Sequence, residues 1–188
     1  MKNNSNYSKE YCPSKTECFE IIREYGTPTH VQSHCNAVGE TAKAIAKELN
    51  NKGLKINVDL VSSAGYLHDV ARVHKKHELV GAQYLKSKGL IDVSEVIKDH
   101  TKHKINTEIQ RLNEEDVLCI ADRVVLENKF VGPQKRMEYI KSKAIKKYGQ
   151  ESEGALDWMI YEFVSFINEL EIFIGKKIYD IIPGNIRW

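Results

Sequence analysis

The stretch that decides the fold is Ala64-Gly65-Tyr66-Leu67-His68-Asp69, an apolar run that ends in a histidine and an aspartate. Apolar residues recur around it at helical spacing, which predicts a helix capped by Asn57. His68 falls on the apolar stripe, so its imidazole is expected to face the interior. Asp69 lies about 100° further round the helix and reaches the same place only at the helix edge. The predicted stripe comprises Leu60, Val61, Ala64, Leu67 and Ala71.

Three other predicted helices each place one ligand-type side chain on an apolar stripe, namely His34, His100 and Asp122. A buried imidazole or carboxylate costs free energy unless it is paired, hydrogen-bonded or bound to a metal. A bound cation would account for the inward positions of all these polar side chains. Adjacent histidine and aspartate donors suit Fe, Mn, Zn or Ni rather than the metals of thiolate sites. His77 opens a short helix with a weaker stripe and is a further candidate for an inward position.

The fold class is predicted to be all-α, because helical periodicity recurs along the chain and no convincing strand alternation appears. Ser14 and Glu17 form a capping box that opens the first helix. The length of 188 residues favours one domain over residues 13–188, preceded by a flexible tail over 1–12. The predicted helices cover about 14–25, 28–52, 57–71, 77–87, 92–102, 113–125, 134–148 and 153–180.

The charge and cysteine content indicate which partners and which cellular compartment to expect. The net charge is +2, from 28 basic and 26 acidic side chains, so no global field attracts nucleic acid or an anionic membrane. The four cysteines form no CxxC pair, which is typical of reduced thiols in the cytoplasm. The first residues contain no apolar signal-like segment, so we expect a cytoplasmic protein.

The region 155–182 is strongly apolar but carries charged side chains that would be costly in a bilayer. We therefore expect it to form core or a subunit interface. Its aromatic content is compatible with a homodimer. The aromatic residues concerned are Trp158, Phe163, Phe166, Phe173 and Tyr179.

Taken together, His34, the 64–69 run and the later Ala121-Asp122 pair resemble the H…HD…D signature of the HD superfamily of metal-dependent phosphohydrolases. The resemblance covers roughly residues 27–130 and implies a compact helical bundle there. The additional C-terminal helices predicted over about 131–188 have no counterpart in it. The segments 77–82 and 97–101 look like the extra histidine segments of HD enzymes that hold two metals. The nearest class is the bacterial HD-type dinucleoside-tetraphosphate hydrolases, although residues 123–127 differ from the acidic-proline-arginine sequence of that class.

The resemblance implies a ligand set and an activity. His34, His68, Asp69 and Asp122 would hold one metal, Asp69 would bridge, and His77 and His100 would complete a second site. The cofactors would be one or two divalent or transition metal ions (Fe, Mn, Ni, Zn or Mg), with Fe or Mn favoured. Asp69 and His68 would be catalytic. The reaction would be hydrolysis of a phosphate ester or anhydride by metal-activated water, with a phosphorylated small molecule, preferably a nucleotide, as substrate.

Positive side chains are needed for the phosphoryl oxygens, and Arg72, Lys75 and Lys76 are the closest in sequence to the His-Asp pair. His103 is a further substrate-binding candidate, although a solvated loop explains all four residues equally well. Two other functions fit the same residues. A di-iron site of this kind could activate O₂, and a nonenzymatic module could sense a nucleotide; six candidate ligands argue against the latter, because structural sites are normally four-coordinate.

Overall fold

The computed structural model describes residues 11–149 and 153–187, so the predicted tail over 1–12 lies almost wholly outside the described residues. The described chain is helical apart from one short hairpin, and the all-α prediction is confirmed. Two 3₁₀ turns, Ile109–Arg111 and Gly184–Ile186, supplement the helices. The elements are α1 Lys15–Glu24, α2 Thr29–Asn51, α3 Val58–Leu67, α4 His77–Ser87, α5 Ile91–Ile97, α6 Glu114–Asp122, β1 Val125–Leu126, β2 Lys129–Phe130, α7 Pro133–Tyr148, α8 Glu153–Ile174 and α9 Ile178–Ile181.

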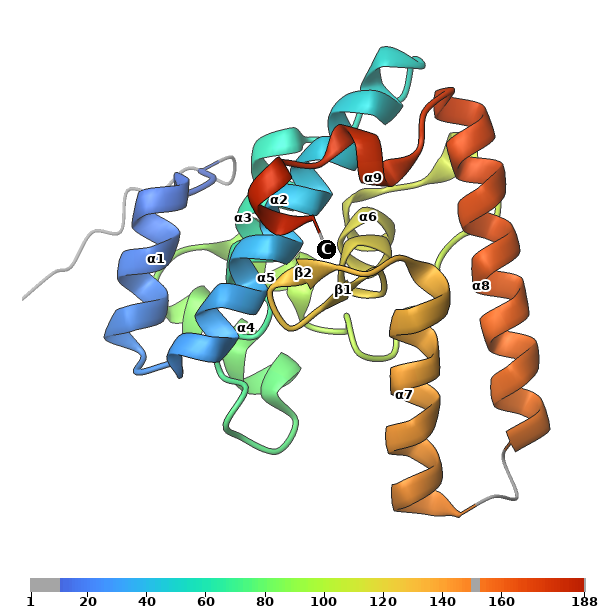
Figure 1. The fold of residues 1–188 in the computed structure, drawn as a ribbon. Helices are drawn as coiled ribbons and strands as arrows, with labels where there is room; N and C mark the ends of the chain where they lie inside the picture. Colours follow the sequence, from blue (N-terminus) through green and yellow to red (C-terminus); the bar gives the residue numbers. More distant parts are fainter. Residues whose placement is uncertain (1–10, 150–152, 188) are drawn as a thin grey trace, which may run out of the picture.

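Helix α2 runs through the centre of the molecule and packs against α3 and α6 (Figure 1). Two glycines let α2 and α3 come into close contact. A Cβ at Gly65 would lie 2.6 Å from the Gly39 Cα, and a Cβ at Gly39 would lie 2.2 Å from the Tyr66 ring. Real Cβ atoms do not tolerate such distances, so the spacing of the two helices depends on both glycines.

The predicted helix starts are confirmed by side-chain caps. Ser14 and Glu17 form the expected capping box, and the Asn57 side chain accepts a hydrogen bond from the Leu60 amide. Asn113 forms a second capping box with Asp116 at the start of α6. These caps satisfy amides that the first turn of a helix leaves without a partner.

Several predicted helix ends are wrong. Helix α3 ends at Leu67 rather than near Ala71, and α5 ends at Ile97 rather than near residue 102. In both places a histidine just past the end donates a hydrogen bond to a carbonyl of the last turn, from His68 to Gly65 and from His100 to Ile97. A side chain that satisfies these carbonyls lets the helix stop there.

The C-terminal half also differs from the prediction. Helix α6 ends at Asp122 and is followed by the antiparallel hairpin β1–β2, in which Val125 pairs with Phe130. Such two-residue strands are too short to show an alternating pattern. The long apolar helix stops at Ile174, because Gly175 adopts a left-handed φ of 75° and turns the chain into α9.

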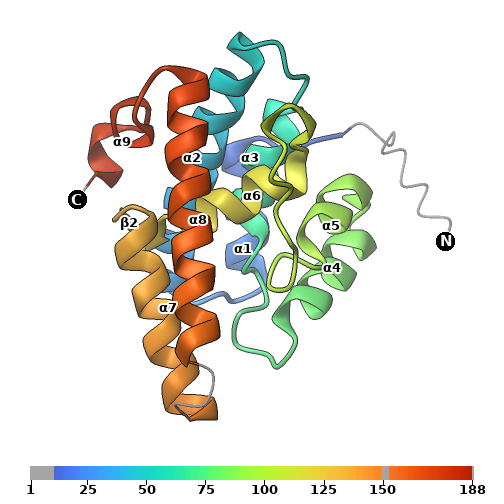
Figure 2. The same cartoon turned by 90° about the vertical axis from the view of Figure 1, so that its right-hand side faces the viewer.

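Helices α7 and α8 lie side by side and extend from the body of the molecule, as both views show (Figures 1 and 2). One face of α8 is buried and includes Phe163, Phe166 and Leu170, which confirms a core role for this segment. Its opposite face exposes Trp158, Tyr161 and Ile172, and the homodimer stays a prediction. Within the described ranges, no helix has the length and apolarity needed to cross a membrane.

We predict that Gly65→Ala lowers the free energy of unfolding by about 3 kcal/mol, because the added methyl group overpacks the α2–α3 contact. Chemical denaturation followed by circular dichroism measures this change. Gly154→Ala is the matched control, since its Cβ would meet no atom within 4 Å. Unchanged stability of Gly65→Ala would show that the two helices do not approach this closely.

Candidate metal centre

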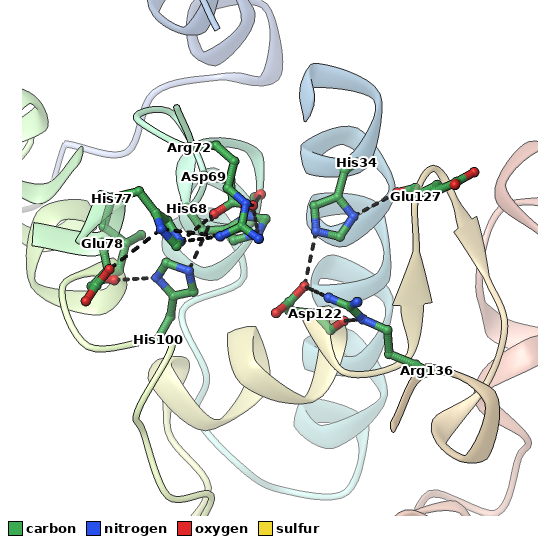
Figure 3. Close-up of polar contacts among 12 residues, drawn as sticks. His34, His68, Asp69, Arg72, His77, Glu78, His100, Asp122, Glu127 and Arg136 are labelled. Atoms are coloured by element: carbon green, nitrogen blue, oxygen red, sulfur yellow. Dashed lines mark hydrogen bonds and ion pairs between the residues drawn. The ribbon is translucent and has the colours of Figure 1, made fainter. Parts of the chain in front are cut away.

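Six candidate ligands from separate parts of the chain meet in one region (Figure 3). His34 lies on α2 and Asp122 is the last residue of α6. His68 and Asp69 occupy the turn after α3. His77 is the first residue of α4, and His100 follows the end of α5; thus most of these side chains project from helix ends rather than from helix faces.

Three of the histidines are held in the same orientation by main-chain carbonyls. His34 Nδ1 donates to the Glu127 carbonyl at 2.7 Å, His68 Nδ1 to Gly65 at 2.8 Å, and His100 Nδ1 to Ile97 at 2.7 Å. A carbonyl only accepts, so the hydrogen must sit on Nδ1 of each ring. Each Nε2 therefore faces the centre, the orientation that a metal-ligating histidine requires, and in His34 it lies 3.1 Å from Asp122 Oδ1.

The ligand atoms form two overlapping groups. His34, His68 and Asp122 make one group, and His68, Asp69 and His100 make the other, with the atoms of each group within 4.8 Å of one another. His77 Nε2 lies 3.0 Å from Asp69 Oδ1. Asp69 therefore sits between His77 and the second group, and His68 belongs to both groups.

Two atoms in this region show that the residues fit a bound cation. His68 Nε2 and Asp69 Oδ1 are buried, and neither makes a well-directed hydrogen bond to any residue that the structure describes. The approach of His77 to Asp69 Oδ1 is close in distance but lacks hydrogen-bond direction. A buried lone pair left unsatisfied costs free energy, and a metal ion would satisfy both atoms.

Burial and neighbouring charges shift the pKa values of the ionisable groups in this centre in different directions. Burial lowers the pKa of His68 to about 4, which keeps this ring neutral at physiological pH. Burial also disfavours the charged forms of His34 and His100, but the neighbouring carboxylates outweigh it and raise both pKa values. For Asp69 and Asp122, burial acts to raise the pKa, but the surrounding histidine and arginine side chains hold it well below the usual range, so both carboxylates are ionised.

Two arginines contact the buried carboxylates. Arg136 Nε donates to the Asp122 carbonyl at 3.1 Å, and its Nη2 donates to Asp122 Oδ1 at 3.2 Å. Arg72 Nε lies 3.4 Å from Asp69 Oδ2, and its Nη1 lies 3.0 Å from His77 Nε2. The contact of Arg136 with this centre could not be predicted from the sequence, because Arg136 comes from α7 and no periodicity signals a contact over this chain distance.

The centre opens into a cleft of about 1430 Å³. Of the predicted substrate-binding residues, Arg72 and His103 line this cleft, whereas Lys75 and Lys76 are exposed in the turn before α4 and do not. His103 Nε2 also contacts the buried Asp116 at 2.7 Å, which gives it a structural role. The basic side chains along the cleft are Arg72, Lys102, Lys104, Arg123 and Arg136.

Comparison with protein families identifies an HD domain over residues 31–126, about half of the chain, and the protein therefore belongs to the HD domain family. This family consists in general of metal-dependent hydrolases that bind divalent metals, and all six candidate ligands fall within the matched residues. The matched residues end before α7, so Arg136 lies outside the family region.

An uncharacterized protein of Methanocaldococcus jannaschii is similar to this chain, with 40% identity over 63 residues. The alignment covers 32% of this chain and 37% of that relative, so the chain spans well under half of the relative's length. No solved structure matches the chain. The comparisons thus support membership of the HD family. The class of substrate has to be inferred from the chemistry of the site.

We predict that the protein binds transition metal and that Asp69→Ala loses it, because Asp69 lies among three histidines of the centre. Elemental analysis of protein purified without an affinity tag gives the stoichiometry. Asp99→Asn is the control, since this exposed carboxylate next to His100 does not line the cleft. Two equivalents would support a second site at His77 and His100, one equivalent would remove that site, and none after reconstitution would contradict the metal centre.

Proposed function

We propose that this protein is a metal-dependent phosphohydrolase that cleaves a phosphate ester or anhydride of a small molecule, with nucleotides as the favoured class. The observation that carries the proposal is the convergence of four histidines and two ionised aspartates at a cleft that basic side chains also line. Among the described residues, two buried atoms of this group, His68 Nε2 and Asp69 Oδ1, make no well-directed hydrogen bond. Such a site suits an anionic substrate and a cation. The free thiols of Cys12, Cys18, Cys35 and Cys119 support a reducing compartment such as the cytoplasm.

In this proposal, His34, His68, Asp69 and Asp122 hold the first metal, and His77 and His100 contribute to a second. A bound metal supplies Lewis-acid polarisation of a phosphoryl oxygen and a water molecule that ionises near neutral pH. The neutral His68 keeps its Nε2 lone pair available, because its pKa of about 4 prevents protonation at working pH. Asp69 would accept a hydrogen bond from the attacking water through a carboxylate oxygen not engaged with the metal, and so orient the water toward phosphorus.

Arg72 and Arg136 are the proposed contacts for the non-bridging phosphoryl oxygens. Both line the cleft, and both already lie beside carboxylates of the centre. A guanidinium group offers paired N–H donors that match the spacing of phosphoryl oxygens. We do not assign this role to Lys75 and Lys76, because they do not line the cleft.

We predict that the metal-loaded protein hydrolyses phosphate esters or anhydrides and that Asp69→Ala and His68→Ala each lower kcat/KM at least about 10³-fold, since metal activation contributes several kcal/mol. Phosphate release from mononucleotides and dinucleoside tetraphosphates measures this activity. Asp99→Asn should retain it. Metal binding with no phosphate release, together with an O₂-dependent optical change, would instead favour the di-iron oxygenase; tight nucleotide binding without turnover would favour a sensor.

We predict that Arg136→Ala lowers kcat/KM about 10²-fold, because the phosphoryl group loses a charged donor, and that Arg136→Lys recovers part of the loss. Steady-state kinetics gives kcat and KM for each variant, and metal content is measured alongside. If Arg136→Ala keeps its metal and its full kcat/KM, Arg136 only balances the charge of Asp122.

A further inference from the structure

The two C-terminal helices form one wall of the cleft, although they lie outside the residues that match the family. Arg136, Met137, Tyr139 and Ile140 line the cleft from α7, and Met159, Glu162 and Phe163 line it from α8. The helices pack against each other along their length (Figure 2). This wall is therefore a feature of this chain beyond the family's metal centre.

Two large side chains leave apolar surface uncovered on this wall. Tyr139 is 39% exposed and Met159 is 38% exposed, whereas Met137 and Phe163 beside them are buried at 2% and 7%. Exposed apolar surface inside a ligand cleft is unfavourable in water and is stabilised when an apolar part of a ligand covers it.

Arg136 lies between the apolar wall and the metal centre and contacts both. Its guanidinium carbon lies 5.8 Å from the centre of the Tyr139 ring, and its Nη2 lies 3.2 Å from Asp122 Oδ1. One guanidinium group thus spans the gap between a candidate metal ligand and the aromatic ring. A phosphoryl group bound beside Arg136 would direct its attached alcohol or nucleoside portion toward Tyr139.

We propose that Tyr139 and Met159 determine substrate specificity by packing against a flat apolar group in the organic portion of the phosphate substrate. The proposal deepens the phosphohydrolase function and rests on it. Tyrosine offers a rigid ring for offset or edge-to-face contact, and methionine offers a polarizable thioether that adapts to a ring edge. The substrate class is accordingly a phosphate ester or anhydride that carries an aromatic or comparable planar group.

Binding of two non-hydrolysable phosphonates to the metal-loaded protein tests the proposal. Benzylphosphonate and ethylphosphonate share the anionic group and differ in the ring, and their C–P bond resists hydrolysis. We expect the native protein to bind benzylphosphonate about tenfold more tightly by calorimetry. The double variant Tyr139→Ala/Met159→Ala should lose this preference and keep the affinity for ethylphosphonate, and Tyr139→Phe alone should preserve the preference.

Tyr161→Ala is the matched control, because Tyr161 is 63% exposed on α8 and does not line the cleft. Equal affinity for the two phosphonates in the native protein, no binding of either, or an undiminished preference in the double variant would overturn the specificity role. Hydrolysis of benzyl phosphate and ethyl phosphate is measured in parallel, since both release a primary alcohol. A ring preference in binding, with no hydrolysis of these esters, of mononucleotides or of dinucleoside tetraphosphates, would overturn the phosphohydrolase proposal and leave the ligand-binding role of Tyr139 and Met159 standing.

Discussion

The contact between α2 and α3 at Gly39 and Gly65 is the constraint on which the rest of the structure depends. The two backbones touch there, with no room for a side chain on either partner. This spacing brings the imidazole ring of His34, on α2, next to that of His68, which follows α3. The two ring centroids lie 5.3 Å apart. A wider separation would open the metal centre, because the remaining ligands approach it from helices packed on this pair.

The centre also shows how buried charge is accommodated in this fold. Two ionised carboxylates, the buried Asp69 and the part-buried Asp122, lie close together at the inner end of the cleft, and isolated charges there would destabilise the folded chain. Histidine rings and the guanidinium groups of Arg72 and Arg136 offset them. Among the residues that the structure describes, the same arrangement leaves His68 Nε2 and Asp69 Oδ1 without a well-directed hydrogen bond. The free-energy cost of folding the apoprotein and the affinity for a cation therefore have a common origin.

Much of the fold could be predicted from local signals, because a cap such as Asn57 or Asn113 acts within one helical turn. Inward histidines and aspartates were also visible, since they interrupt apolar stripes. The helix ends at His68 and His100 were missed because a side-chain hydrogen bond to the last turn leaves no mark on periodicity. Arg136 could not be predicted because its partner is distant in the chain, and proximity in sequence favoured Lys75 and Lys76, which do not line the cleft.

The β1–β2 hairpin, between α6 and α7, connects the candidate ligand His34 with residues 185–187. Glu127, at its tip, has a left-handed φ of 53°, and its carbonyl accepts the hydrogen of His34 Nδ1. The hairpin is in turn held by a bridge from Phe130 to Arg187 and by a bond from Lys129 to the Asn185 carbonyl. A fragment cut at residue 126, the boundary of the family match, would retain all six candidate ligands and lose the group that orients His34. The residues matched by the family therefore do not include the group that orients one of their own candidate ligands.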